Sequence, residues 1–306
     1  MATHHLSREA DHVHYDWDRD RDAVLSVAPG DTVTVECHDA ADGQLPEDAT
    51  VADVEAVNAP GHPMTGPIYV EGAEPGDTLA VDVLGLEHEG IGWTYVSPSE
   101  TEAGFLPEEF PDGAVYTWDL DDDDVAHFRQ GIEMPLAPFP GNLGVVPAEP
   151  GPHSTIPPRS VGGNLDIKHL TAGSTLYLPV EVAGGLFSVG DLHAAQGDGE
   201  VCITAIEIPG QIRLRLRLAD RDVDGPALDP AGPYAPLGDG SVTAVAGLGG
   251  DVNEASREAV RAMIAELASE HDLSRTEAYM LCSAAVDLKV SEVVNDTVVV
   301  TAYAAV

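Results

Sequence analysis

APGDTVTVE, at residues 28–36, is typical of a tight turn followed by a strand. Pro-Gly favours the turn, and the alternating apolar residues after it have the period of two expected of a half-buried strand. The same plan recurs as EPGDTLAVD at residues 74–82 and, more loosely, as AGSTLYLPV at residues 172–180. These copies fit a β-sandwich whose hairpins share one turn chemistry.

Strand patterns continue along much of the chain. Residues 211–218 read QIRLRLRL, which gives a strand with one apolar and one charged face. We expect its arginines to pair with surface carboxylates. Near-continuous strand is also predicted at residues 174–182 and 200–218, and a last strand at 297–303.

Two helices are predicted near the C-terminus. Asp251 or Asn253 can cap a helix that runs to about Ser269. Ser274 and Glu277 have the spacing of a capping box and open a second helix. The residues expected to point inward from this second helix are Tyr279, Met280, Leu281, Ala284 and Ala285.

We therefore predict a mainly β fold with an α+β C-terminal part. Residues 1–220 form β-sandwich-like sheets that carry the site motifs, and residues 221–306 form a smaller α+β region with two helices that completes the same fold. Residues 98–131 are expected to be a surface excursion, either a lid or an ordinary acidic loop. Residues 135–158 are expected to be a proline-rich, rigid connector packed under the site.

Acidic residues dominate the composition. The chain has 53 Asp and Glu against 14 Lys and Arg, a formal net charge of −39. The acids are spread along the whole chain, which indicates a protein built for a salt-rich cytoplasm, where counterions screen the repulsion. Nucleic acid is excluded as a partner, because no basic patch could neutralise phosphates.

The cysteines and the N-terminus point to a reducing compartment. Cys37, Cys202 and Cys282 are odd in number and far apart, so neither a thiolate zinc site nor a disulfide framework is expected. Neither a signal-peptide core nor an apolar run long enough to span a bilayer is present. We expect a soluble, cytoplasmic protein that does not bind a membrane.

GGLFSVGDLHAAQGDGE, at residues 184–200, gathers the groups best suited to chemistry. Glycine-rich stretches flank carboxylates, an imidazole and an amide, which can bind a metal ion or move protons. Asp191 and His193 are two residues apart in an extended segment, so their side chains point the same way. Other polar groups lie in VGGNLDIKH at residues 161–169 and beside Asp39.

Elimination narrows the reaction class. The sequence has no G-x-S-x-G elbow, no phosphate-binding loop and no G-x-G-x-x-G opening a helix after a strand. Carboxylates, histidines and a rare lysine remain, which suit a metal-activated water or general acid–base catalysis. Lys168, one of two lysines, could hold a carboxylate, donate a proton to a leaving amine, or form a plain surface ion pair.

Several motifs together resemble the acetamidase/formamidase family. They are TGPIYVEGAEPGD at residues 65–77, GNLGVVP at 141–147, GGNLD at 162–166, GDLHAAQGDGE at 190–200 and EAYMLCS at 277–283. The resemblance implies hydrolysis of a short aliphatic amide to a carboxylate and ammonia by a mostly β protein. It also implies a homodimer and, as in some members, a bound divalent ion.

The matching positions, together with Lys168 and Gly163, supply the candidate site. We expect a divalent metal ion, zinc or calcium, to be bound by Asp39, Asp191, His193 and Glu200. We expect catalysis by Glu71, Asp166 and Lys168, and binding of the small amide by Gly163, Asn164 and Gln196. In the alternative hypothesis, the chain is a noncatalytic, metal-stabilised β-sandwich binding module whose acidic loops hold calcium.

Overall fold

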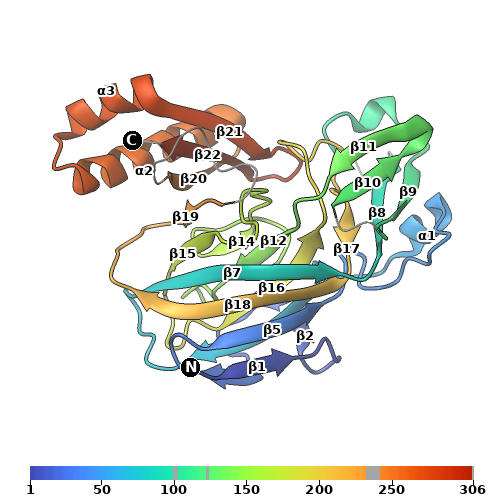
Figure 1. The fold of residues 1–306 in the computed structure, drawn as a ribbon, viewed down its shortest axis with the longest axis horizontal. Coiled ribbons are helices and arrows are strands. Elements are labelled where there is room, and N and C mark those ends of the chain that lie inside the picture. The colour runs from blue at the N-terminus through green and yellow to red at the C-terminus, as the bar shows by residue number, and fades with distance from the viewer. Residues whose placement is uncertain (99–102, 122–123, 232–241, 305–306) are drawn as a thin grey trace.

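The turn-and-strand pattern that opens the sequence forms β5 (Thr32–Cys37), in which alternate residues are buried. The computed structural model describes residues 1–98, 103–121, 124–231 and 242–304. Within them, β5 belongs to a nine-stranded sheet (Figure 1). Its strands lie in the order β1 (Thr3–Leu6), β5, β18 (Gly210–Ala219), β7 (Thr78–His88), β15 (Thr175–Pro179), β19 (Ala227–Asp229), β20 (Thr243–Gly249), β22 (Val298–Ala304) and β21 (Val286–Glu292). Strands from both sides of residue 220 therefore share this sheet.

A second sheet packs against the first. Its main path runs β14 (Gly162–Asn164), β12 (Phe139–Gly144), β16 (Phe187–His193), β17 (Glu207–Ile208), β8 (Ile91–Val96) and β9 (Ala114–Asp119). β6 (Met64–Val70) pairs with β16, β2 (Val13–His14) and β4 (Leu25–Val27). Two small pairs complete the β structure: β10 (Val125–Phe128) with β11 (Ile132–Pro135), and β3 (Asp16–Trp17) with β13 (His153–Ser154).

One hydrophobic core joins the two sheets. Val33 and Val35 of β5 belong to the same buried cluster as Phe139 of β12 and Val189 of β16. Burying such side chains between two sheets stabilises the fold by about 25 cal/mol per Å² of apolar surface. The predicted mainly β, sandwich-like class is confirmed.

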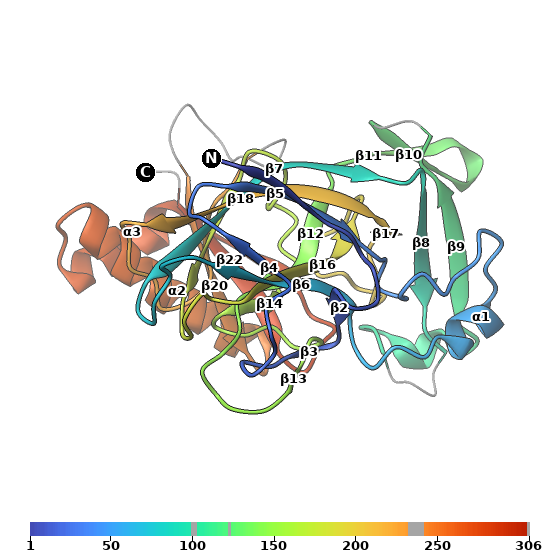
Figure 2. The ribbon, with the colours of Figure 1, turned by 90° about the horizontal axis from the view of Figure 1, so that it is seen from below.

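The helices follow the sequence signals closely. Asp251 caps α2 (Val252–Glu270), and its side chain accepts a hydrogen bond from the backbone N–H of Glu254 at 2.8 Å. Ser274 opens α3 (Arg275–Ala285) with a capping box. Helix α2 packs on β20 and β22 of the first sheet, and α3 packs against α2 and β21. Figures 1 and 2 show that the short α1 (Val51–Ala56) lies at the other end of the molecule. None of the described helices is long and apolar enough to cross a membrane.

The predicted inward face of α3 is wrong at Tyr279, Met280 and Ala284, which are exposed, whereas Leu281 packs against the C-terminal core as predicted. Tyr279 and Met280 are 61 % and 60 % exposed, whereas Ala278 and Cys282 are buried. Ala278 and Cys282 are four residues apart and so lie on one face, which rotates their neighbours away from α2. Small residues on that face let the two helices pack closely.

The secondary structure of three segments differs from the prediction. The strand expected at residues 200–218 is interrupted by turns at residues 201–203, before β17. The expected connector at residues 135–158 contains β12, which is buried along its whole length. The excursion at residues 98–131 contains β9 and β10 and two 3₁₀ turns, Pro107–Glu109 and Arg129–Gly131; its residues 99–102 and 122–123 lie outside the described ranges.

Candidate active site

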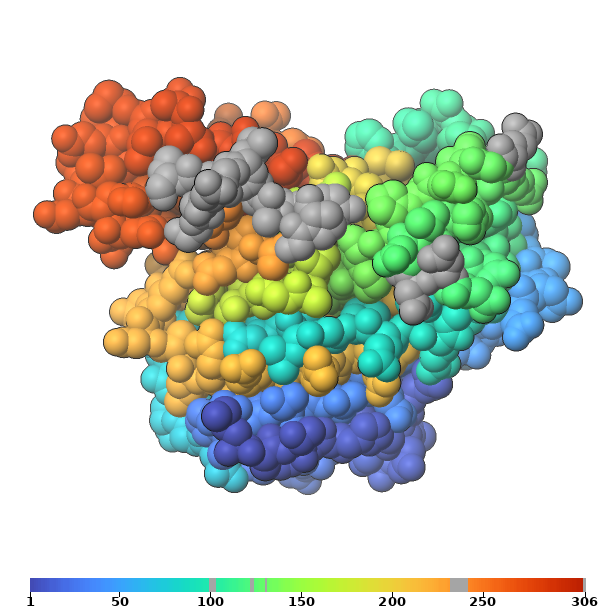
Figure 3. Space-filling view, viewed as in Figure 1, coloured from blue at the N-terminus to red at the C-terminus, as the bar shows by residue number. Residues whose placement is uncertain are grey.

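Four carboxylates and one imidazole converge at the end of β16. Asp191 and His193 come from β16 itself, and Glu207 opens the neighbouring β17. Asp166 lies just after β14, and Glu200 lies in the loop between β16 and β17. We call these five residues the acid–imidazole cluster; each is at most 7 % exposed. In Figure 3, the yellow segment around residue 200 lies between the red C-terminal part and the green β10–β11 pair.

His193 stands at the centre of the cluster. Its Nε2 lies 3.2 Å from Oε2 of Glu207 and 3.4 Å from Oδ1 of Asp191. Oε1 of Glu200 is 3.9 Å from the same nitrogen, and Oδ1 of Asp166 is 4.0 Å from Nδ1. One small volume is thus surrounded by oxygen and nitrogen atoms from four segments of the chain.

The side-chain amide of Gln196 orients the imidazole. Its Nε2 donates to the backbone carbonyls of Asp166 at 3.0 Å and Ser291 at 3.2 Å, so its Oε1 must be the end that faces His193. That oxygen accepts a hydrogen bond from Nδ1 of His193 at 2.9 Å. This contact keeps a proton on Nδ1 and turns Nε2 toward the carboxylates. Although burial opposes the charge, Glu207 and Asp191 raise the pKa of His193 well above its usual range, so Nε2 also holds a proton until a cation replaces it.

Several atoms of the cluster are buried without a hydrogen-bond partner in the described part of the chain. They are both carboxylate oxygens of Asp166, Nε2 of His193 and Oε2 of Glu207. Buried polar atoms are normally satisfied, because burying one without a partner costs about 1–3 kcal/mol. A cation between these atoms would satisfy them, and imidazole with carboxylates is a donor set that suits zinc, whereas carboxylates alone suit calcium.

Burial and mutual repulsion decide the protonation of the cluster. Burial raises the pKa of Asp166 and of Glu200 well above the usual range, and raises the pKa of Glu207 to about 7. Burial also opposes the charge of Asp191, but His62 and His193 outweigh it and lower the pKa of that carboxyl. The cluster therefore tends to take up positive charge, as protons or as a metal ion.

The backbone beneath the cluster is strained. Asp166, Asp191 and Glu200 have φ values of +48°, +53° and +48°. These values lie in the left-handed region, which residues other than glycine rarely adopt. Strained backbone of this kind gathers at functional sites, where the surrounding structure enforces it. At these three positions, the left-handed backbone directs the carboxylates of Asp166, Asp191 and Glu200 into the cluster.

Gly141 of β12 forms the floor of the cluster. A Cβ atom at this position would lie 2.6 Å from Oδ1 of Asp166, 2.7 Å from Cε1 of His193 and 3.0 Å from Oδ2 of Asp191. Only glycine lets the backbone approach so closely. The segment predicted to pack under the site does so, as a strand.

A small cavity of about 130 Å³ opens beside the cluster. Asp191, Glu200 and Glu207 form its acidic side. The other polar residues that line it are His62, Tyr95, Asn164 and Asn295. Oδ1 of Asn164 is buried and has no hydrogen-bond partner among the described residues. Drug-sized ligands occupy cavities of about 300–1,000 Å³, so this one suits a molecule of few atoms.

Six predicted site residues are thus brought together by the fold. They are Asn164, Asp166, Asp191, His193, Gln196 and Glu200. Gln196, expected to bind substrate, instead uses both ends of its amide to hold His193 and the neighbouring backbone.

The other predicted residues lie elsewhere or contribute through the backbone. Asp39 is buried and accepts a hydrogen bond from the N–H of Ala41. It belongs to neither of the two buried ligand groups among the described residues, Asp166–Asp191–His193 and His193–Glu200–Glu207. Glu71 is exposed and accepts from Ser26 at 3.4 Å, outside the cluster, because the turn after β6 turns it to solvent. Gly163 pairs with Leu143 in the sheet at φ +97°.

Lys168 links two loops of the site. Its Nζ lies 3.0 Å from Oδ1 of Asp198, which joins the loop of Asp166 to the loop of Glu200. Its ammonium group is absent from the lining of the small cavity.

Sequence reasoning missed Glu207, His62, Tyr95 and Asn295. Glu207 could have been found, because a carboxylate between Ile206 and Ile208 breaks an otherwise apolar run. His62 carried only the signal of an imidazole between glycine and proline. Tyr95 and Asn295 lie far from every motif, and only the fold brings them to the cavity.

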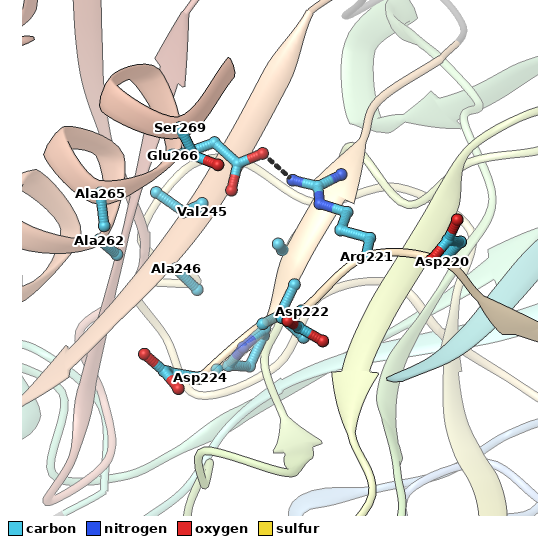
Figure 4. Close-up of a pocket in the computed structure, with 14 residues that line it drawn as sticks. Asp220, Arg221, Asp222, Asp224, Val245, Ala246, Ala262, Ala265, Glu266 and Ser269 are labelled. Atoms are coloured by element: carbon cyan, nitrogen blue, oxygen red, sulfur yellow. Dashed lines mark hydrogen bonds and ion pairs between the residues drawn. The ribbon is translucent and has the colours of Figure 1, made fainter. Parts of the chain in front are cut away.

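A larger cavity of about 390 Å³ lies elsewhere, between the segment after β18 and helix α2. Figure 4 shows Arg221 and Glu266 facing each other across it, joined by an ion pair of 2.6 Å. Its lining contains neither histidine nor cysteine. The acid–imidazole cluster is therefore the better candidate for chemistry.

Comparison with known proteins agrees with the motifs. The profile of the Acetamidase/Formamidase family matches residues 2–154 and 151–304. The formamidase of Methylophilus methylotrophus is 31% identical over 67% of this chain and 64% of its own length, and the acetamidase of Mycolicibacterium smegmatis is 32% identical over 67% and 65%. The chain spans about two thirds of the length of these curated relatives.

A solved structure agrees over nearly the whole fold. The crystal structure of an acetamidase from Bacillus halodurans superposes with a TM-score of 0.87 at 32% identity, covering 98% of this chain and 97% of that one. The resemblance inferred from the motifs is confirmed, and the chain belongs to the acetamidase/formamidase family.

Proposed function

We propose that this protein hydrolyses the C–N bond of an amide, giving a carboxylate and ammonia. The observation that carries the proposal is the buried acid–imidazole cluster with partnerless atoms, which borders a small polar cavity. Relatives named formamidase and acetamidase support the same reaction. In the reaction, the oxygen of water bonds to the acyl carbon, the C–N bond breaks and a proton moves to the departing nitrogen.

We infer that a divalent cation, zinc or calcium, belongs to the cluster. His193 and Asp191 would hold it with Glu207, and Glu200 would complete the set. Such an ion lowers the pKa of a bound water and polarises a carbonyl oxygen. Gln196 keeps the lone pair of His193 aimed at that position, as outer ligands of metal sites commonly do.

The remaining groups are assigned by their chemistry. Asp166 is suited to accept the proton of water and to pass it to the leaving nitrogen, because burial favours its protonated form. Tyr95, whose pKa is raised by burial and by nearby acids, stays protonated and can donate to the amide oxygen. Oδ1 of Asn164 can accept from the amide N–H₂ group. Lys168 holds the two loops together rather than donating a proton.

The direct test is ammonia release from formamide and acetamide, with and without chelator. Asp191→Asn should lower kcat/KM by about 100-fold or more, because it removes both a charge and a ligand. Asp287→Asn, at an exposed position on β21, is the matched control and should retain the wild-type rate. Full activity after exhaustive chelation would remove the metal from the proposal. A melting temperature that rises with calcium, while no amide is hydrolysed, would favour the noncatalytic binding module.

We also propose that the protein works as a homodimer in a salt-rich cytoplasm. The net charge of −39 supports the salt adaptation, and the dimer rests on the family resemblance. Light scattering after size-exclusion chromatography at about 0.2 M and about 2 M KCl tests both points, since salt screens repulsion between acidic subunits. A monomeric mass at both salt concentrations would contradict the dimer.

A further inference from the structure

A second, apolar cavity lies beside the acid–imidazole cluster. Its volume is about 570 Å³, several times that of the small polar cavity. Its walls include Trp118, Phe128, Met134, Ile206, Gln196 and Glu200. We propose that it binds a large apolar acyl group, so that the amides used by this protein extend beyond formamide and acetamide to arylacetamides. This inference rests on the proposed function and names its substrate class.

The position of the cavity connects it to the reaction centre. Glu200 lines both cavities and belongs to the cluster, and Gln196 lines the apolar cavity while it holds His193. Glu200 is therefore a wall that the two cavities share. An amide whose carbonyl sits at the cluster would extend its acyl chain past Glu200 into the apolar cavity.

One wall of the cavity is formed by packed aromatic rings. The ring centroids of Trp118 and Phe128 are 5.3 Å apart, and Tyr116 packs against both at 4.8 and 4.5 Å. Such geometries stabilise aromatic groups and favour a further aromatic ring. Phe128 remains 38 % exposed, although this chain carries acids over much of its surface. An exposed apolar surface within an acidic protein indicates a binding role.

Hydrogen bonds fix this wall relative to Glu207. Nε1 of Trp118 donates to the hydroxyl of Thr94 at 2.9 Å, and that hydroxyl donates to the carbonyl of Ala205 at 2.5 Å. The N–H of Ala205 in turn donates to Oε1 of Glu207 at 2.8 Å. The aromatic wall and a carboxylate of the cluster are thus held by one peptide segment, which sets the distance between acyl group and reacting carbonyl.

Charge selects among acyl groups. Among the residues that the structure describes, the charged ones that line the cavity are both acids, Asp198 and Glu200. Asp198 is already paired with Lys168 at 3.0 Å. A carboxylate on the acyl chain would meet repulsion here, whereas a phenyl ring would gain apolar contacts at no electrostatic cost. The cavity therefore fits an uncharged aryl group.

The test compares phenylacetamide with formamide in the metal-loaded wild type and in Phe128→Ala. Phe128 is partly exposed, so truncation should leave the fold intact. We expect phenylacetamide to have the higher kcat/KM, and Phe128→Ala to lower the ratio of the two kcat/KM values by about tenfold, the scale of hydrophobic discrimination. Met134→Ala should lower the ratio in the same direction. Tyr279→Ala, at an exposed aromatic residue on α3, is the control and should not change it.

Calorimetric binding of phenylacetamide separates this inference from the proposed function. Binding that weakens in Phe128→Ala supports the cavity even if no amide is hydrolysed, and in that case only the proposed function fails. Turnover of formamide with the same ratio in Phe128→Ala and wild type overturns the cavity while the proposed function stands. If phenylacetamide is neither bound nor hydrolysed, the proposed role of the apolar cavity is also overturned.

Discussion

Oε1 of Gln196 accepts a hydrogen bond from Nδ1 of His193 at 2.9 Å, and this contact decides which imidazole nitrogen faces the acids. Because the amide nitrogen of Gln196 is occupied by two backbone carbonyls, the amide cannot turn round without losing both. With its proton held on Nδ1, the imidazole turns Nε2 toward the acids, where a metal ion can replace the second proton.

Gln196→Met should lower the affinity for the divalent cation by about 10–100-fold, the usual effect of losing a group that orients a ligand. The variant keeps the volume of the side chain but has neither donor nor acceptor for His193 and the loops. Titration calorimetry on chelator-stripped protein measures the change. Gln211→Met, at a glutamine on β18 that donates to Glu87, is the control. Equal affinities in Gln196→Met and wild type would mean that the amide does not orient His193.

Gly141→Ala should disrupt the cluster from below. The new methyl group would have to displace Asp166, His193 or Asp191, because each lies within 3.0 Å of the Cβ position. We expect amidase activity to fall by about 100-fold or more, since small displacements of catalytic groups are costly. Gly85→Ala on β7 is the matched control, because its nearest neighbour would be the end of Arg213 at 3.8 Å. If Gly141→Ala were as active as Gly85→Ala, the cluster would tolerate the displacement of its side chains, contrary to this prediction.

Acidification should destabilise the protein through His14. Burial, with help from Arg21, lowers the pKa of His14 to about 4, and its Nε2 is 2.8 Å from the hydroxyl of Ser188. The unfolded chain binds this proton near pH 6.5, so stability is retained above that pH and lost as the pH falls toward 4.

Urea unfolding at about pH 7 and about pH 5 tests the role of His14, which should account for a loss of about 2 kcal/mol between them. His14→Gln should reduce the loss by that amount, and His5→Gln, at an exposed histidine, should not. If His14→Gln loses as much stability as wild type, the imidazole is not held neutral.

Salt should stabilise the fold. With a net charge of −39, repulsion favours the unfolded chain, and the Debye length falls from about 10 Å to about 3 Å between 0.1 and 1 M salt. We expect Tm to rise by about 5 °C or more in molar KCl, which for a chain of this size is a gain of roughly 2 kcal/mol. The rise should shrink near pH 4, where many carboxylates are protonated. A Tm that is constant or falls with KCl would contradict salt adaptation.

The sequence predicted the fold class because its signals were local. Pro-Gly turns with alternating strands, the cap at Asp251 and the capping box at Ser274 depend on neighbouring residues, and the structure contains all of them. The prediction for the inward face of α3 was wrong at Tyr279 and Met280, because the orientation of this helix is set by its packing against α2, which local sequence does not specify.

The candidate site was predictable where its residues lie in motifs. Asp191 and His193 are two residues apart on one strand, and the glycine-rich stretches indicated where the backbone approaches side chains. Glu207 and Tyr95 were missed because β17 and β8 reach the cluster through sheet pairing, which spacing in the sequence does not reveal. Glu71 was included on the strength of a motif, although the turn places it at the surface.

The most direct test of the account is an anomalous-difference map from crystals soaked with zinc, recorded above the zinc absorption edge. We expect a peak between Nε2 of His193 and the carboxylates of Asp191 and Glu207, at about 2.0–2.2 Å from the ligand atoms. A map without a peak at these residues, from crystals whose protein hydrolyses amides, would contradict it.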